Sequence, residues 1–155
     1  MYVAVVDGLP QVRFFSLREA NALIATLQEQ FEQARELRDE LSAVQSQLSD
    51  AGYPLTEAEV EVDKTAPPAV QRLQRAASRV LDELRGVLHG VTELGVEVKA
   101  ADGLCDFRTR LHGRIVLLCW RFGEERITHY HELETGFASR RPLPDDGDFI
   151  GDLLH

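Results

Sequence analysis

The sequence has fewer basic than acidic residues. It contains 17 Lys and Arg against 26 Asp and Glu, which gives a formal net charge of −9. Nucleic acids and anionic membrane surfaces attract proteins through a cationic surface. We therefore expect neither of them as the main partner. A cluster of arginines in the second half still allows a small anionic ligand: Arg108, Arg110, Arg114, Arg140 and Arg141.

Cysteine is scarce as well, and long apolar segments are absent. Cys105 and Cys119 both lie beside apolar residues in strand-like segments. One disulfide between them is possible, but two buried free thiols in a reducing compartment fit the pattern better. The apolar start of the chain lacks basic residues and is too short for a signal peptide or a membrane span. These features predict a bacterial cytoplasmic protein.

The length and hydrophobic content predict a single domain, residues 1–155. With 155 residues and 44% hydrophobic composition, the chain can bury one core. Residues 14–95 are predicted to form a helical hairpin with a connection at 50–66. Ser16 and Glu19 have the spacing of a capping box, and the apolar pattern after them predicts one long helix ending before Asp50.

The second helix carries a heptad-like apolar seam. Pro67 and Pro68 suit its first turn, where missing amide groups cost little. The seam residues alternate at intervals of three and four: Val70, Leu73, Ala77, Val80, Leu84, Val87, Val91 and Leu94. Packing inside the hairpin is the more common use of such a seam. Its length also predicts self-association through the helices, and hence a homo-oligomer.

The period changes to that of strands after residue 95. Residues 96–142 predict an antiparallel meander of about four strands, with Asp102-Gly103 as a hairpin turn. Residues 143–155 are expected to form a loop-like tail anchored by apolar side chains: Phe149, Ile150, Leu153 and Leu154. The predicted fold class is α+β, with a long antiparallel two-helix hairpin followed by a small β-meander.

Two histidines form the first candidate site. His129 and His131 are two residues apart on a predicted strand, so both face the same way and are weak candidates for a divalent metal site. Gly123 and HYH resemble the opening of a cupin motif, but the remaining spacing departs from it. The simpler interpretation is that one histidine is partly exposed and the other is held by a hydrogen bond. Because His131 lies deeper in the predicted strand, we expect it, not His129, to be the partly buried histidine, bonded to a carboxylate or a backbone carbonyl group.

Charged residues among the strands form the second candidate site. Its members are Glu97, Lys99, Asp106, Glu124, His131 and Arg140. They predict either a polar pocket or a buried ion-pair network that fixes the register of the sheet, and we favour the network. The helices lack the Glu-x-x-His pairs of di-metal carboxylate bundles. Motifs for a nucleophilic serine or a phosphate-binding glycine loop are also missing.

Four motifs in order resemble a known family. FSLREAN, EVKAADGLCDF, LCWRFGE and YHELETGFASR are similar to the prokaryotic domain of unknown function 2203, from about Phe14 to Pro142. Ala100 stands where the family commonly has an acid, and Tyr130 where it has tryptophan. No activity is established for this family. The resemblance marks motif positions only: Glu97, Lys99, Asp106, Trp120, Gly123, Glu124, His131, Gly136 and Arg140.

Two functions follow as hypotheses from this pattern. The first is a non-enzymatic, homo-oligomeric module for interaction or small-ligand binding, because a seam is present and a catalytic motif is missing. The alternative is an enzyme that depends on a metal or an acid–base pair. His131 would act as base or ligand and Arg140 as an anion clamp. The carboxylate partner of His131 would be Glu97, Asp106 or Glu124.

Overall fold

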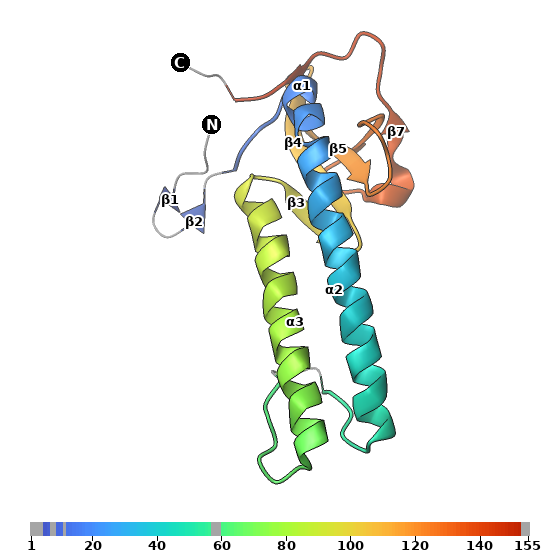
Figure 1. Cartoon of the computed structure of the whole chain (residues 1–155). Coiled ribbons are helices and arrows are strands. Elements are labelled where there is room, and N and C mark those ends of the chain that lie inside the picture. The colour runs from blue at the N-terminus through green and yellow to red at the C-terminus, as the bar shows by residue number, and fades with distance from the viewer. Residues whose placement is uncertain (1–4, 7–8, 11, 57–59, 153–155) are drawn as a thin grey trace. The chain divides into compact units, whose positions relative to one another are not determined.

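The computed structural model describes residues 5–6, 9–10, 12–56 and 60–152 (Figure 1). Its helices are α1 (Leu17–Ala22), α2 (Ile24–Asp50), α3 (Pro68–Glu93) and the 3-10 helix η1 (Phe137–Ser139). Its strands are β1 (Val5–Val6), β2 (Leu9–Pro10), β3 (Glu97–Ala100), β4 (Leu104–Leu111), β5 (Arg114–Arg121), β6 (His129–Glu132), β7 (Arg141–Pro142) and β8 (Phe149–Ile150). The predicted α+β class is confirmed. No helix in the described part of the chain has the length and apolar character needed to cross a membrane.

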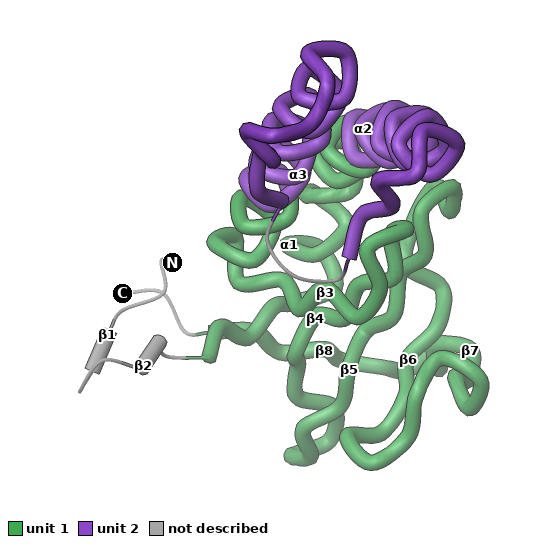
Figure 2. The backbone as a smooth tube through the Cα atoms, turned by 90° about the horizontal axis from the view of Figure 1, so that it is seen from below, with its two compact units in different colours: residues 1–31, 88–155 green, residues 32–87 purple. Residues whose placement is uncertain are grey.

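The chain divides into two compact units. The sheet unit comprises Met1–Phe31 and Leu88–His155, and the hairpin unit comprises Glu32–Val87. Figure 2 shows the two units in green and purple. The hairpin unit is continuous in sequence, whereas the sheet unit is assembled from the segments before and after it.

The first helix begins as the capping box predicts. The Ser16 hydroxyl oxygen accepts a hydrogen bond from the Glu19 amide at 3.0 Å, and the Glu19 carboxylate accepts one from the Ser16 amide at 2.9 Å. The prediction of one uninterrupted helix is wrong at a single residue. Leu23 separates α1 from α2, because its amide bonds to the Ala20 carbonyl oxygen, three residues back, as in a 3-10 turn.

The hairpin unit packs its own seam. Buried residues from both helices and the connection form its core: Val44, Leu48, Ala66, Val70 and Ala77. Tyr53, Leu55 and Val60 of the connection pack against this core. An ion pair of 2.6 Å between Arg79 and Glu40 joins the two helices at the surface. The two helices therefore bury seam residues against each other within one chain, as the simpler interpretation predicts.

The main sheet has six antiparallel strands in the order β3-β4-β5-β6-β7, with β8 paired to β4. The meander is confirmed over β3 to β6, and two short strands extend it. Phe149 in β8 is buried and anchors the tail as expected, whereas Ile150 is exposed. Leu153 and Leu154 lie outside the described residues. Beside β8, the Asp152 amide donates to the Phe14 carbonyl oxygen and ties the segment to residues near α1.

A two-residue turn fixes the register of the central hairpin. His112 and Gly113 both have positive φ angles, 52° and 77°, as a tight turn between antiparallel strands requires. The β4–β5 ladder follows without a shift from Leu111↔Arg114 to Leu104↔Arg121. Because side chains alternate along a strand, this register decides which face each residue of the hairpin occupies.

One face of the sheet forms the core of its unit. Phe107 contacts Phe15 edge-on with ring centroids 5.2 Å apart, and Trp120 lies 6.1 Å from Phe31. Cys105 is registered opposite Trp120 and shares this face, whereas Cys119 is registered opposite Asp106 on the other face. The two cysteines are both buried and free, and their opposite orientation excludes a disulfide between them.

Candidate functional site

The face of the sheet opposite the aromatic core carries a row of polar residues. Glu97 pairs with Asp106, Asp106 with Cys119, and Cys119 with His129 across four neighbouring strands. His131 lies two residues beyond His129 in β6 and so faces the same side. The registers therefore bring side chains of β4, β5 and β6 together at one place.

Asp106 and His131 form a buried pair at this place. His131 Nε2 lies 3.0 Å from Asp106 Oδ2, and each side chain is 3% exposed. His131 Nδ1 lies 2.8 Å from the Glu132 carbonyl oxygen. A carbonyl oxygen can only accept a hydrogen bond, so Nδ1 carries a proton and Nε2 is directed at the carboxylate. One proton is then shared between Nε2 and Oδ2. The expected type of hydrogen-bond partner of His131 is confirmed, and its burial is more complete than the partial burial expected.

Burial dominates the titration of Asp106. It raises the pKa of this carboxyl group because water is excluded, while the neighbouring His131 acts in the opposite direction. The second oxygen, Oδ1, is buried and has no hydrogen-bond partner. A buried carboxylate oxygen without a partner costs free energy. The pair is therefore satisfied on one side of the carboxyl group only.

Cys119 is the third member of the cluster, and the sequence-based analysis missed it. Ligand atoms of Asp106, Cys119 and His131 all lie within 4.8 Å of one another, and all three residues are buried. Burial and the Asp106 carboxylate raise the pKa of the Cys119 thiol to about 12, whereas Arg140 lowers it. The register set by the His112-Gly113 turn places Cys119 opposite Asp106. This turn is the feature of the sequence from which the position of Cys119 could have been predicted.

The remaining predicted site residues form two separate groups. Glu97 contacts Lys99 at 3.2 Å and Arg108 at 3.3 Å on the partly exposed edge of the sheet. Glu124 contacts Arg140 at 3.1 Å. Arg140 also acts on the Cys119 thiol through a side-chain hydrogen bond, so it links Glu124 to the buried cluster.

Glu124 has a structural role in the turn after β5. Its carbonyl oxygen accepts hydrogen bonds from Trp120 Nε1 at 2.9 Å and Gln28 Nε2 at 3.1 Å. Its carboxylate accepts a further bond from the Arg121 amide at 2.7 Å. These bonds hold the turn against the buried tryptophan and the first part of α2.

His129 lies apart from this cluster. It is half-buried, and its Nδ1 lies 2.8 Å from the Thr128 hydroxyl group. Among the described residues, the set with converging ligand atoms contains His131 without His129. The two-histidine metal site therefore receives no support from the geometry, because the ring of His131 turns towards β4 instead.

The clustered arginines all contact other side chains of the sheet unit. Arg108 and Arg140 pair with Glu97 and Glu124, while Arg114 and Arg141 both pair with Glu132. Arg110 lies over the ring of Phe14, 3.7 Å from its centroid. An anionic ligand would have to compete with these carboxylates.

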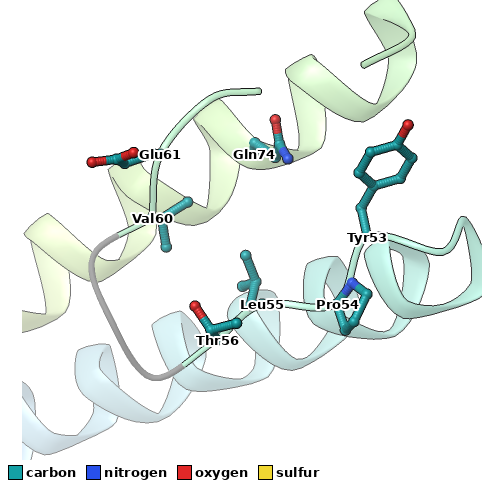
Figure 3. A pocket seen from close by; sticks show the side chains of 7 residues that line it. All are labelled: Tyr53, Pro54, Leu55, Thr56, Val60, Glu61 and Gln74. Atoms are coloured by element: carbon teal, nitrogen blue, oxygen red, sulfur yellow. The ribbon is translucent and has the colours of Figure 1, made fainter. Parts of the chain in front are cut away.

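Two surface cavities of the described part of the chain lie away from the cluster. A cavity of about 500 Å³ in the hairpin unit is lined by residues of the connection and α3, which Figure 3 shows: Tyr53, Pro54, Leu55, Thr56, Val60, Glu61 and Gln74. A second cavity, of about 550 Å³, lies at the turn after β5 and is lined by Glu124, Glu125, Arg126 and Thr128. Neither is lined by Asp106, Cys119 or His131, so the cluster is sealed from both.

The comparisons with known proteins agree with the motifs. Searches of curated proteins and of solved structures found no significant match to this chain. A family model described as "Uncharacterized conserved protein (DUF2203)" matches residues 13–143 of the 155-residue chain. All residues of the buried cluster lie within the matched segment. The protein therefore belongs to the DUF2203 family, as its four motifs predict.

Proposed function

We propose that this protein is a non-enzymatic module of the bacterial cytoplasm that binds copies of itself or a small ligand. One observation supports the non-enzymatic part above all. The residues best suited to acid–base chemistry, Asp106 and His131, are each 3% exposed and bonded to each other. A general base must come within hydrogen-bond reach of its substrate. The two free thiols, Cys105 and Cys119, fit a reducing compartment.

The third helix supports self-association. Leu73, Leu81 and Leu84 are half-buried in the single chain, although the neighbouring Val70 and Ala77 are buried. Half-buried leucines retain apolar area that a second copy can cover, and burial of such area stabilises an interface.

Light scattering on the purified protein, with a dilution series, tests this part of the proposal. We expect an oligomer whose mass falls on dilution. Leu81→Gln combined with Leu84→Gln should shift the protein towards monomer, while Arg72→Gln on the exposed face of α3 is the matched control. Circular dichroism verifies that the variants keep their helices. A wild-type protein that remains monomeric at tens of micromolar contradicts the proposal.

An acid–base enzyme is the second candidate, and the Asp106–His131 pair is the observation that favours it. A carboxyl group whose pKa is raised by burial, beside a histidine, is a combination found in active sites. This function requires the pair to become accessible. Diethyl pyrocarbonate labelling followed by mass spectrometry tests access, with the exposed His112 as the internal reference. Labelling of His131 at the rate of His112 favours the enzyme, and protection of His131 rules it out.

A further inference from the structure

We propose that Asp106, Cys119 and His131 bind a divalent transition metal, with Zn²⁺ as the best fit, in a closed structural site inside the sheet. The three residues offer one carboxylate, one thiolate and one imidazole, which are the side chains that hold Zn²⁺ in proteins. Their ligand atoms already lie within 4.8 Å of one another. Around tetrahedral Zn²⁺ such atoms are about 3.3–3.7 Å apart, so no pair of ligand atoms has to approach by more than roughly 1.5 Å.

The imidazole of His131 is oriented as a metal ligand. Its Nδ1–H donates to the Glu132 carbonyl oxygen at 2.8 Å, which leaves Nε2 as the coordinating nitrogen. A carbonyl group that fixes the other ring nitrogen is the usual outer partner of a metal-bound histidine. Nε2 and Asp106 Oδ2 are 3.0 Å apart. A metal ion bound to both atoms would take the place of the proton that they share.

The free oxygen of Asp106 supports the same site. Oδ1 is buried without a hydrogen-bond partner, which is costly in a metal-free interior. Coordination through both carboxylate oxygens would satisfy it and complete the donor set without a further residue. This unpaired atom is a second observation, independent of the convergence of the three side chains.

The charges of the site balance with a divalent metal. Zn²⁺ with one thiolate, one carboxylate and one neutral imidazole has a net charge of zero, which suits a position shielded from water. Binding forms bonds from the metal to sulfur, oxygen and nitrogen. It releases one proton from the Cys119 thiol and one from the Asp106–His131 pair.

Closure distinguishes this site from a catalytic one. Catalytic Zn²⁺ keeps a position open for water or substrate, whereas structural Zn²⁺ is enclosed by protein ligands. All three residues are buried, and they come from three neighbouring strands. A metal there would cross-link β4, β5 and β6, so its free energy of binding would add to the stability of the fold.

Cobalt binding tests the inference on the full-length chain. Protein purified without a nickel column is stripped with a chelator and titrated with Co²⁺, whose thiolate complex has a charge-transfer band in the near ultraviolet. We expect one Co²⁺ per chain, displacement of it by Zn²⁺, release of two protons per metal in calorimetry in different buffers, and a higher melting temperature with Zn²⁺.

Two cysteine variants locate the site. Cys105→Ala is the matched control, because Cys105 is equally buried but faces the aromatic core. This variant keeps Cys119 as its only thiol and should retain the charge-transfer band. Cys119→Ala should lose it. The proposal is overturned if wild-type protein and Cys105→Ala give no band and no change in melting temperature, an outcome that does not depend on the folding of Cys119→Ala.

Discussion

Asp106 and His131 are bonded side chain to side chain although their strands are not neighbours. Asp106 lies on β4 and His131 on β6, with β5 between them, yet Nε2 and Oδ2 are 3.0 Å apart. The contact therefore spans the width of the central strand. It links the two outer strands of this three-stranded part of the sheet in addition to the backbone ladders.

Loss of His131 should destabilise the protein much more than loss of His129. His131→Ala removes the group that pairs with the buried Asp106 carboxyl group and leaves a cavity. We therefore expect the free energy of unfolding to fall by about 1–3 kcal/mol. His129 is half-buried, and its Nδ1 lies 2.8 Å from the neighbouring Thr128 hydroxyl group. His129→Ala should change the free energy of unfolding by less than about 0.5 kcal/mol. Urea denaturation measures both. Equal small losses would mean that the buried pair contributes nothing.

Asp106→Asn should be tolerated better than Asp106→Ala. Asparagine has nearly the same shape, and its amide group can donate a hydrogen bond to Nε2 of a neutral His131. It also avoids the burial of a carboxylate, whose pKa is raised in the fold. We expect the alanine variant to be less stable than the asparagine variant by about 1 kcal/mol or more. Urea denaturation of metal-free protein at neutral pH provides the comparison, and the opposite order would contradict it.

Neither thiol should react in the folded, metal-free protein. Cys105 and Cys119 are 0% and 1% exposed, and burial raises the pKa of each to about 12. Only the thiolate reacts readily with alkylating and disulfide reagents. We expect both cysteines to remain unmodified in Ellman's assay at pH 8 and to react once urea unfolds the chain. Rapid reaction of either thiol in buffer would show that the sheet opens locally.

Asp63 should make the hairpin unit sensitive to acid. Its carboxylate accepts hydrogen bonds from the Thr65 hydroxyl at 2.6 Å and the Thr65 amide at 2.9 Å, which lower its pKa. A lowered pKa contributes stability above the pKa of the unfolded chain, and this stability is lost as pH falls through the folded value. Thr65→Val removes the hydroxyl donor and should raise the Asp63 pKa towards 3.8, as NMR titration measures.

Asp63→Asn serves as the control for this titration. Asparagine does not ionise, so the acid-dependent part of the stability that comes from this position should disappear. An Asp63 pKa that is the same with and without the Thr65 hydroxyl group would show that the hydrogen bond seen in the structure does not persist in solution.

Local signals predict most of the fold. The capping box at Ser16 and Glu19, the Asp102-Gly103 turn and the period of the apolar residues are set by neighbouring residues, and each is confirmed. The interruption at Leu23 was missed because residues on both sides are good helix formers. Strands β7 and β8 were missed because each has two residues, too few for a period to appear.

Prediction of the buried cluster requires the register of the strands, which local sequence patterns do not contain. His131 was identified from its depth in the predicted strand, and Asp106 was named among its candidate partners. Cys119 was taken as an ordinary core residue, because the apolar segment IVLLCWR hides which of its residues face the polar side. Register decides this, and it follows from the turn at His112 and Gly113.

The placement of β8 beside β4 constrains the order in which the chain can fold during synthesis. The hairpin unit, Glu32–Val87, is continuous and has left the ribosome before any strand of the main sheet. The sheet unit needs Phe15 from the start of the chain and Phe149 from near its other end. Pairing over such sequence separation is slow. The nascent chain should therefore carry a formed hairpin while Asp106, Cys119 and His131 are still exposed to solvent and accessible to metal ions.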